Sequence, residues 1–341
     1  MKISLGMKLQ PGPWGGGNQF GHSLAEYLHH KRVEVSFDLR EPDLDLIVLA
    51  EPRSNLKISA YSDKDIVKYL LRKNQRAVVV HRINECDERK GTAGVNQRLM
   101  RANAGADHTV FISSWLRDLF LSYGLKTPEY RVILNGANRA IFNAGGYERW
   151  NGAGKLRLVT HHWGGGRLKG FDIYECLDRM LSEPTFSEKL EFTYIGKLPS
   201  GFRFTAARYV PPQSGDKLAT SIRSHHVYLT ASQNEPAGMH HIEGSMCGLP
   251  LLYRESGALP EYCDGFGISF TAENFEQKLE EMMETYDYWA DRMKDYPHTA
   301  ERMCQNYYNL FVELLERRDE IVKRRKWWRR PVWLAQTLLS M

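Results

Sequence analysis

Short apolar runs alternate along the chain with longer segments of helical periodicity, and the runs fall into two series. Runs rich in Val, Ile and Leu predict β-strands, and segments such as 19–30 and 63–73 predict helices between them. The first series of strands is expected at residues 3–5, 33–37, 44–50, 77–80, 108–112 and 131–134, and the second at 156–161, 190–195, 227–230, 250–253 and 268–270. Strands separated by helices favour parallel sheets in α/β layers.

Two series of strands predict two Rossmann-like domains. The length of 341 residues supports this, because it exceeds the usual size of a single domain. The segment 137–154 contains Asn-Ala-Gly-Gly and is the expected linker. We expect residues 1–140 and 141–305 to form the two domains. Residues 306–341 are expected to form a C-terminal helix that returns toward the first domain, followed by a basic, tryptophan-rich tail.

The composition, 42% hydrophobic and 26% charged residues, is typical of a soluble globular protein. We expect neither a signal peptide nor a membrane span, because the chain opens on a short strand and a glycine-rich loop and no apolar run reaches about eighteen residues. The five cysteines are scattered and form no C-x-x-C pair. They favour reduced thiols in a cytosolic protein and give no zinc site.

Two carboxylates, Glu235 and Glu243, stand eight positions apart in the segment 234–250. Pro236 fits the first turn of a helix and Gly248 is a typical stop, so a helix of about ten residues is expected between them. Eight steps of about 100° return close to the starting direction. Glu243 would therefore lie about two turns beyond Glu235 on the same side.

The start of this expected helix suits an anion. The free N–H groups of Ala237, Gly238 and Met239 would point out of the helix N-terminus beside Glu235, where a diphosphate is favoured. An anion site with a carboxylate on either side of it suits a bound nucleotide sugar.

A glycine-rich turn follows the first strand of each series. In the first turn, Gly16 and Gly17 lead into a helix and let backbone N–H groups approach a ligand. In the second, Arg167 offers a planar fork and Lys169 a point charge, and both suit a diphosphate. A nicotinamide cofactor is an alternative ligand for the first turn, although Phe20 stands where the G-x-G-x-x-G pattern requires its third glycine.

The segment 234–250 resembles the E-x7-E signature of retaining glycosyltransferases with the GT-B fold, in particular family 4, in which E-P-F-G-L-x-x-x-E-A-M-A-C-G-L-P is typical. The chain departs from this pattern at Ala237, His240 and His241. Lys169 followed by Gly170 is similar to the basic pair of that family. The resemblance implies an α/β GT-B fold, in which two Rossmann-like domains have parallel sheets facing across a deep cleft.

The same resemblance implies the reaction. The protein would be a retaining, metal-independent hexosyltransferase that uses a nucleoside diphosphate sugar, with UDP or GDP as the expected nucleotide. The acceptor would be a glycan or lipid-linked molecule in cell-surface polysaccharide or glycolipid biosynthesis. A catalytically silent nucleotide- or glycan-binding module of the same fold is the main alternative, and a nicotinamide-dependent Rossmann enzyme is the second.

The resemblance also gives each candidate residue a role. Gly16 and Gly17 would border the donor phosphates, and Glu243 would accept hydrogen bonds from the ribose hydroxyls. Glu235 would contact the transferred sugar, either as a nucleophile or as a stabiliser of its cation-like ring. The leaving diphosphate would be held by Lys169, Arg167 and the backbone of Ala237, Gly238 and Met239.

His81 follows the expected strand at 77–80, where the family often places a histidine that contacts the acceptor sugar. It is the third catalytic candidate beside Glu235 and Lys169, and a purely structural histidine is an equally open interpretation.

The sequence requires neither a metal nor a cofactor. Asp43 and Asp45 have the D-x-D spacing of metal-dependent glycosyltransferases of another fold, but here they precede an apolar strand instead of ending one. His240 and His241 are adjacent, so on a helix they diverge by about 100° and cannot easily share one ion.

The basic charge is concentrated near the C-terminus. Residues 317–330 contain eight Lys or Arg against two acidic residues, and Trp327, Trp328 and Trp333 lie among them. Cations with interfacial tryptophans favour contact of residues 317–341 with an anionic membrane surface, on the cytoplasmic face. Packing of the tryptophans on the protein with solvated cations is a second interpretation, and nucleic-acid binding is a third and weaker one.

Overall fold

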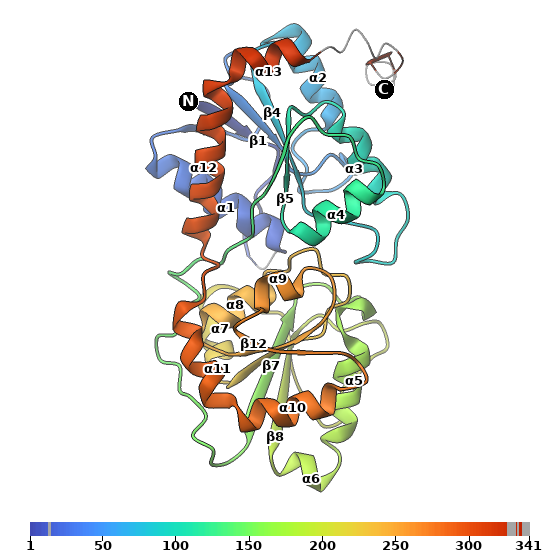
Figure 1. The fold of residues 1–341 in the computed structure, drawn as a ribbon, viewed down its shortest axis with the longest axis vertical. Coiled ribbons are helices and arrows are strands. Elements are labelled where there is room, and N and C mark those ends of the chain that lie inside the picture. The colour runs from blue at the N-terminus through green and yellow to red at the C-terminus, as the bar shows by residue number, and fades with distance from the viewer. Residues whose placement is uncertain (13–14, 326–331, 333, 336–341) are drawn as a thin grey trace.

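The structure is a computed structural model that describes residues 1–12, 15–325, 332, 334 and 335. Figure 1 shows two α/β lobes stacked along the long axis, with the N-terminus in the upper lobe. The predicted pair of Rossmann-like domains is confirmed, because each lobe contains one six-stranded sheet whose strands are all parallel.

The sheet of the first domain has the order β2-β1-β3-β4-β5-β6. All six strands predicted for the first series are present, although β3 is shorter than the apolar run that predicted it. The strands are β1 Lys2–Leu5, β2 Glu34–Ser36, β3 Leu46–Leu49, β4 Val78–Ile83, β5 His108–Phe111 and β6 Tyr130–Val132. The helices between them are α1 Gly16–His30, α2 Asp63–Arg72, α3 Val95–Asn103 and α4 Ser114–Ser122.

The sheet of the second domain has the order β12-β11-β10-β7-β8-β9. Its strands are β7 Leu156–His162, β8 Leu190–Gly196, β9 Arg208–Val210, β10 Val227–Thr230, β11 Leu251–Arg254 and β12 Gly267–Phe270. The strand β9 was not predicted, because it has only three residues, lies at the sheet edge and is mostly exposed. The helices are α5 Phe171–Met180, α6 Pro184–Ser187, α7 Gly215–Arg223, α8 His240–Met246, α9 Leu259–Cys263, α10 Phe275–Glu284 and α11 Tyr286–Arg292, with short 3₁₀ turns η1 Arg167–Lys169 and η2 Met293–Asp295.

The chain crosses between the domains twice, and the two crossings are paired by their backbones. Ala137 N donates to His298 O at 3.2 Å, and Ala300 N donates to Ala137 O at 2.8 Å. A Cβ atom on Gly136 would lie 2.1 Å from Thr299 O, so only glycine fits where the two crossing segments meet.

After the second crossing the chain forms α12 Ala300–Glu316 and α13 Arg318–Arg324, which lie against the first domain (Figure 1). Tyr307, Phe311 and Leu314 of α12 share a buried core with Phe20 and Leu24 of α1. Residue 305, the expected end of the second domain, lies inside α12. Because α12 packs on the core of the first domain, we describe the chain from Ala300 onward with that domain.

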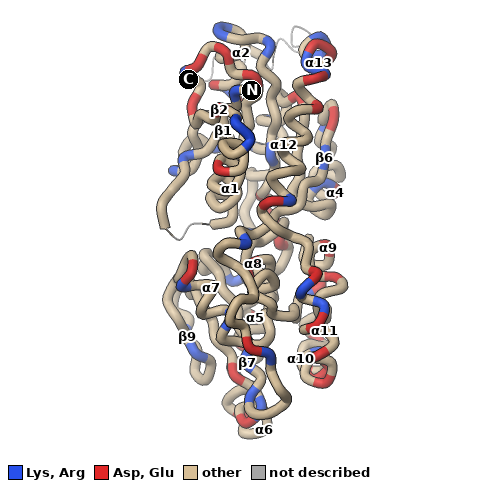
Figure 2. Tube along the Cα trace, turned by 90° about the vertical axis from the view of Figure 1, so that its left-hand side faces the viewer, with Lys and Arg blue, Asp and Glu red and all other residues tan. Residues whose placement is uncertain are grey.

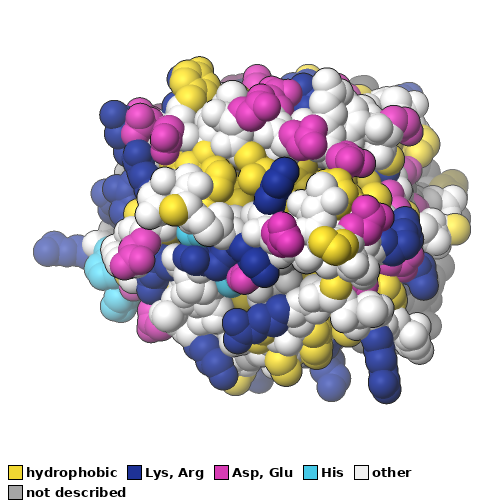
Figure 3. All heavy atoms as spheres, turned by 90° about the horizontal axis from the view of Figure 1, so that it is seen from below, with side chains coloured by type: hydrophobic (Ala, Val, Ile, Leu, Met, Phe, Trp, Pro, Cys, Tyr) yellow, Lys and Arg dark blue, Asp and Glu magenta, His cyan; other side chains and the backbone are white. Residues whose placement is uncertain are grey.

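Charged side chains of both signs are distributed over the molecule. Figure 2 shows basic and acidic residues close together around α13. Figure 3 shows them interspersed with hydrophobic atoms on the end of the molecule formed by the second domain. Within the part of the chain that the structure describes, no helix combines the length and the apolar character that crossing a membrane requires.

Candidate active site

A cavity of about 580 Å³ lies between the two domains. The first domain contributes the start of α1 and the residues that follow β4, and the second contributes the loops after β7 and β10. Lining residues include Gly16, Gly17, Arg82, Glu85, Arg89, His161, His162, Lys169, Glu235, Ala237, Gly238, Met239, His240 and Glu243.

The helix expected from Pro236 is shorter than predicted, because α8 begins only at His240. The cause is a set of contacts made by the first domain. Ser113 Oγ donates to Pro236 O at 2.6 Å, and Asn135 Nδ2 donates to Ala237 O at 3.1 Å. These carbonyls are satisfied across the domain boundary instead of within a helix. The predicted helix N-terminus beside Glu235 is therefore wrong, although Ala237, Gly238 and Met239 do line the cavity as a loop.

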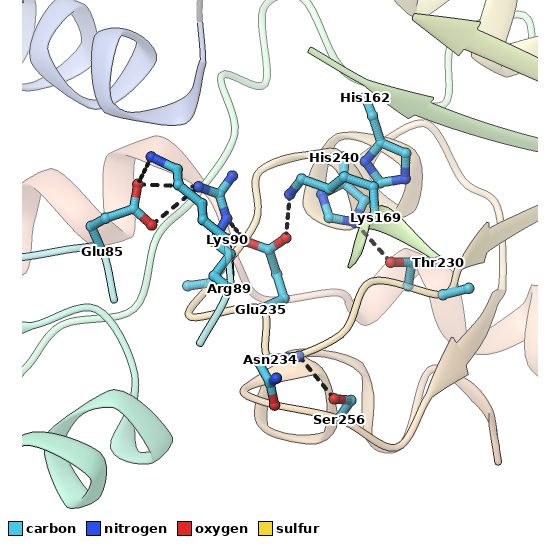
Figure 4. Close-up of polar contacts among 12 residues, drawn as sticks. Glu85, Arg89, Lys90, His162, Lys169, Thr230, Asn234, Glu235, His240 and Ser256 are labelled. Carbon is cyan, nitrogen blue, oxygen red and sulfur yellow. Dashed lines mark hydrogen bonds and ion pairs between the residues drawn. The ribbon is translucent and has the colours of Figure 1, made fainter. Parts of the chain in front are cut away.

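Glu235 is paired with two cations in the cavity. Its Oε2 accepts from Lys169 Nζ at 2.6 Å and its Oε1 accepts from Arg89 Nε at 3.1 Å, with the side chain 2% exposed (Figure 4). Burial alone would raise the pKa of Glu235, but the charges of Lys169 and Arg89 outweigh it and hold the pKa well below its usual range. Burial lowers the pKa of the Lys169 ammonium.

Arg89 was not predicted from the sequence. It lies in the loop between β4 and α3 of the first domain, and its Nη1 donates to both oxygens of Glu85 at 3.2 Å. Lys90 Nζ also lies 2.5 Å from Glu85 Oε2. The segment Asp87-Glu88-Arg89-Lys90, two acidic residues followed by two basic ones, is typical of an ordinary solvated loop. Only the folded chain reveals that Arg89 reaches Glu235.

Glu243 lies deeper in the second domain and has a different partner. Its Oε2 is 2.7 Å from His161 Nε2, and His161 Nδ1 is 2.9 Å from the hydroxyl of Tyr228. These two hydrogen bonds link Tyr228, His161 and Glu243 and fix the orientation of the Glu243 carboxylate at the cavity wall. His161 lies near the end of β7, directly before the second glycine-rich turn, and was not predicted as a site residue.

Gly16 and Gly17 lie at the first turn of α1, and the N-cap residue, Gly15, has no side chain that could cap this N-terminus. A Cβ atom on Gly16 would lie 2.5 Å from Cγ of Met239 in the second domain. Glycine at this position therefore permits the close approach of the two domains at the cavity.

Two candidates predicted from the sequence lie outside the cavity. Arg167 is exposed in η1, and its Nη1 donates to Glu175 Oε1 at 2.8 Å. His81 is fully buried, with its Nδ1 at 2.8 Å from Asn103 Oδ1. Neither is among the residues that line the cavity, whereas Arg89, which the sequence did not indicate, is a second cation beside Glu235.

His240 and His241, the departures from the E-x7-E pattern, are both buried. His240 lines the cavity, and its Nε2 is 2.7 Å from Thr230 Oγ1. The rings of His240 and His162 have centroids 4.5 Å apart, and burial lowers the pKa of both well below the usual value. The two rings are therefore neutral at physiological pH.

The described residues contain no group of three or more His, Cys, Asp or Glu side chains arranged to hold a metal ion. The D-x-D pair has other partners, since Asp43 Oδ1 accepts from Lys2 Nζ at 2.9 Å and Asp45 Oδ1 accepts from Arg318 Nη2 at 2.6 Å. Metal independence remains a prediction.

The arrangement of two parallel six-stranded sheets about an interdomain cavity is the GT-B glycosyltransferase fold. Neither a protein-family model nor a curated protein matches the sequence. Among solved structures, the chain is similar to the catalytic domain of starch synthase IV from Arabidopsis thaliana, with a TM-score of 0.68 at 12% identity, covering 93% of this chain and 99% of that one.

Two further solved structures are similar over a comparable share of the chain. The lipopolysaccharide outer core galactosyltransferase WaaB gives a TM-score of 0.65 at 13% identity, over 92% of this chain and 100% of that chain. HepE of Anabaena, in complex with UDP and glucose, gives 0.63 at 14% identity over 92% and 100%. At such identities the likeness establishes the fold and leaves the reaction to be argued from the site.

Proposed function

We propose that the protein is a retaining glycosyltransferase that moves a hexose-type sugar from a nucleoside diphosphate sugar to a glycan or lipid-linked acceptor. The observation that carries the proposal is the convergence of Lys169, Glu235 and Glu243 on one interdomain cavity that the uncapped start of α1 also borders. Structures of the same fold were solved with UDP and glucose or with ADP, which supports a nucleotide as the ligand. UDP and GDP are the nucleotides we expect.

The two glutamates have different proposed roles, one toward the nucleotide and one toward the transferred sugar. Glu243, oriented by His161, accepts hydrogen bonds from the ribose hydroxyls. Glu235 is ionised at physiological pH because its pKa is held low, so its carboxylate can stabilise the positive charge that develops on the sugar ring as the diphosphate leaves. Lys169 and Arg89 each bind one oxygen of Glu235, and both cations can form ion pairs with the departing phosphates.

We further propose that transfer needs no metal ion, because Lys169 and Arg89 supply two cations at the point where negative charge accumulates. The setting we propose is the synthesis of cell-surface polysaccharide or glycolipid at the cytoplasmic face of a membrane. The C-terminal tail is the proposed contact with an anionic bilayer, and its residues 326–331, 333 and 336–341, including Trp327, Trp328 and Trp333, lie outside the described residues.

Activity against a panel of UDP- and GDP-hexoses tests this proposal. We expect Lys169→Met to lower kcat by about two to three orders of magnitude, because a charge on the leaving group loses its partner. Glu243→Ala should raise the donor KM by about tenfold or more, since it removes hydrogen bonds to the ribose. The matched control is Lys294→Met, which removes an exposed lysine of η2 that is not among the residues lining the cavity.

Unchanged kinetics in both Lys169→Met and Glu243→Ala would contradict the assigned site. Tight binding of a nucleotide sugar without any transfer or hydrolysis by the wild type would instead favour a silent binding module of the same fold.

A further inference from the structure

Arg82 is a buried guanidinium at the end of β4, and it belongs to the wall of the interdomain cavity. Its side chain is 1% exposed. Nε donates to the hydroxyl of Tyr307 at 3.2 Å, and Nη2 donates to Asn135 Oδ1 at 3.0 Å. The guanidinium carbon lies 3.8 Å from the centroid of the Phe20 ring.

All three partners of Arg82 are neutral. None of the described carboxylates forms an ion pair with Arg82, and none of the described residues accepts a hydrogen bond from its Nη1. Other arginines of the cavity differ in this respect, since Arg53 pairs with Glu51 at 2.6 Å and Arg89 with Glu85 and Glu235. A buried charge without a counter-charge is unfavourable, and arginine cannot relieve it by losing its proton.

The surroundings of Arg82 in the cavity favour an anion. Gly16 and Gly17 begin the fifteen-residue helix α1, whose N-cap residue, Gly15, has no side chain and whose first turn has no acidic residue. The partial positive charge of a helix N-terminus adds to that of the guanidinium. Asn135, which holds Nη2, lines the same cavity.

We propose that Arg82 binds an anionic group of a substrate, a phosphate or a carboxylate, with Nη1 as the donor. The group supplies the counter-charge that the protein itself does not. Two sources share this chemistry, the diphosphate of the sugar donor and an acidic group on the acceptor or the transferred sugar. The inference rests on the proposed function in taking the ligand to be a substrate of glycosyl transfer.

A purely structural Arg82 is the competing explanation. Through Tyr307 it joins α12 to β4, and through Asn135 it joins β4 to the segment that leads to the second domain. The two roles give opposite expectations for stability. A structural arginine stabilises the protein by itself, whereas removal of an uncompensated buried charge leaves the unliganded protein as stable as before, or more stable.

Arg82→Met tests the proposal, because methionine retains an apolar stem and removes the charge. The thermal midpoint of the full chain and its affinity for inorganic pyrophosphate, UDP, GDP and D-glucuronate are measured by scanning and titration calorimetry. The matched control is Arg131→Met, which removes an arginine of β6 whose Nη2 lies 2.9 Å from Glu313 and which is not among the cavity residues.

We expect Arg82→Met to keep or raise the midpoint without ligand and to weaken binding of the recognised anion by about tenfold to a hundredfold, the usual effect of losing a charge-assisted hydrogen bond. Arg131→Met should bind like the wild type. Weaker binding of pyrophosphate and both nucleotides assigns Arg82 to the donor, and weaker binding of glucuronate alone assigns it to an acidic sugar.

Three results would overturn the proposal. The first is a lower midpoint in Arg82→Met with wild-type affinity for all four probes. The second is an unfolded Arg82→Met together with wild-type affinity in Arg82→Lys. The third is a wild type that binds none of the probes. Glycosyl transfer by the wild type is measured separately, so its failure is distinguishable from a failure of the Arg82 assignment.

Discussion

Glu235 is held by one cation from each domain, and this makes a single carboxylate sensitive to how the domains meet. Lys169 lies 66 positions before it in the chain and Arg89 lies 146 positions before it. The sequence predicted Glu235 and Lys169 from local motifs. It gave no sign of Arg89, because that contact exists only after the two domains close on each other.

His81 and Arg82 illustrate the limit of position in a strand as a guide. Neighbouring residues of β4 point to opposite faces of the sheet. His81 points toward Asn103 of α3, and Arg82 points toward Phe20 of α1 and Tyr307 of α12. The family resemblance indicated His81 as the candidate contact of the acceptor sugar, but the sequence could not show which face of β4 borders the cavity, and Arg82 rather than His81 lines it.

At the residue scale we predict that His81→Leu lowers stability and leaves catalysis intact. The substitution removes the hydrogen bond to Asn103, which also accepts from Thr109 Oγ1 at 2.9 Å, so a loss of about 1–3 kcal/mol in the free energy of unfolding is expected. Urea titration and steady-state kinetics of the same preparation measure the two effects. A reduced kcat at wild-type stability would return His81 to the catalytic residues.

At the element scale, the sheets follow from local sequence and the loops of the site do not. The six strands predicted for the first series and the five predicted for the second are all present in the two parallel sheets, and only the short edge strand β9 was missed. The length of α8 was mispredicted, because Ser113 and Asn135 of the other domain bind the carbonyls of Pro236 and Ala237. The sequence motifs that mark helix ends are local, so they cannot predict hydrogen bonds from a distant segment of the chain.

The helix α13 shows that part of the basic C-terminal region holds the first domain together. Arg317 and Arg324 pair with Glu129 at 2.7 and 2.6 Å, and Arg318 and Arg325 pair with Asp45 and Asp107. Burial alone would raise the pKa of Glu129, but Arg317 and Arg324 outweigh burial and lower this pKa to about 2. Four of the cations expected to face a membrane are therefore already paired with protein carboxylates.

This pairing changes how the membrane proposal is best tested. We predict that a chain ending at Arg325 keeps the wild-type thermal midpoint but no longer co-sediments with vesicles containing anionic lipid. A chain ending at Glu316 also loses α13, whose Ile321 is fully buried, and should melt at a lower temperature.

A full-length variant with alanine in place of Trp327, Trp328 and Trp333 keeps every cation of the tail. Its co-sedimentation with anionic vesicles therefore distinguishes a contribution of the tryptophans from a contribution of the charge. Sedimentation of the chain ending at Arg325 at the level of the full chain would refute membrane contact by the tail. Salt-sensitive retention of single-stranded DNA by the full chain alone would favour the nucleic-acid alternative.

At the scale of the whole molecule, buried histidines link stability to pH. The described residues include eight histidines whose pKa is lowered from the usual 6.5, with burial as the largest cause. The pKa falls to about 4 in His81, His108, His225, His226 and His298, to about 3 in His241, and well below 6.5 in His162 and His240.

The sign of the effect follows from proton binding. Between about pH 6.5 and 4 the unfolded chain binds protons at these histidines and the folded chain does not, so the free energy of unfolding falls as pH falls through this window. Carboxylates with depressed pKa values, such as Glu235, add to the loss only below their unfolded pKa of about 4.5. The interval from pH 7 to pH 5 therefore isolates the histidines.

We predict that the urea midpoint decreases steadily from pH 7 to pH 5, and that His225→Gln makes the decrease smaller. Glutamine can keep a polar contact with Ser221 O or Thr193 Oγ1, which lie 2.8 and 2.9 Å from the two ring nitrogens of His225, but it cannot take up the proton. His30→Gln is the control, because the side chain of His30 is exposed at the end of α1. An equal slope in all three proteins would mean that His225 gains its proton in the folded state as readily as in the unfolded chain.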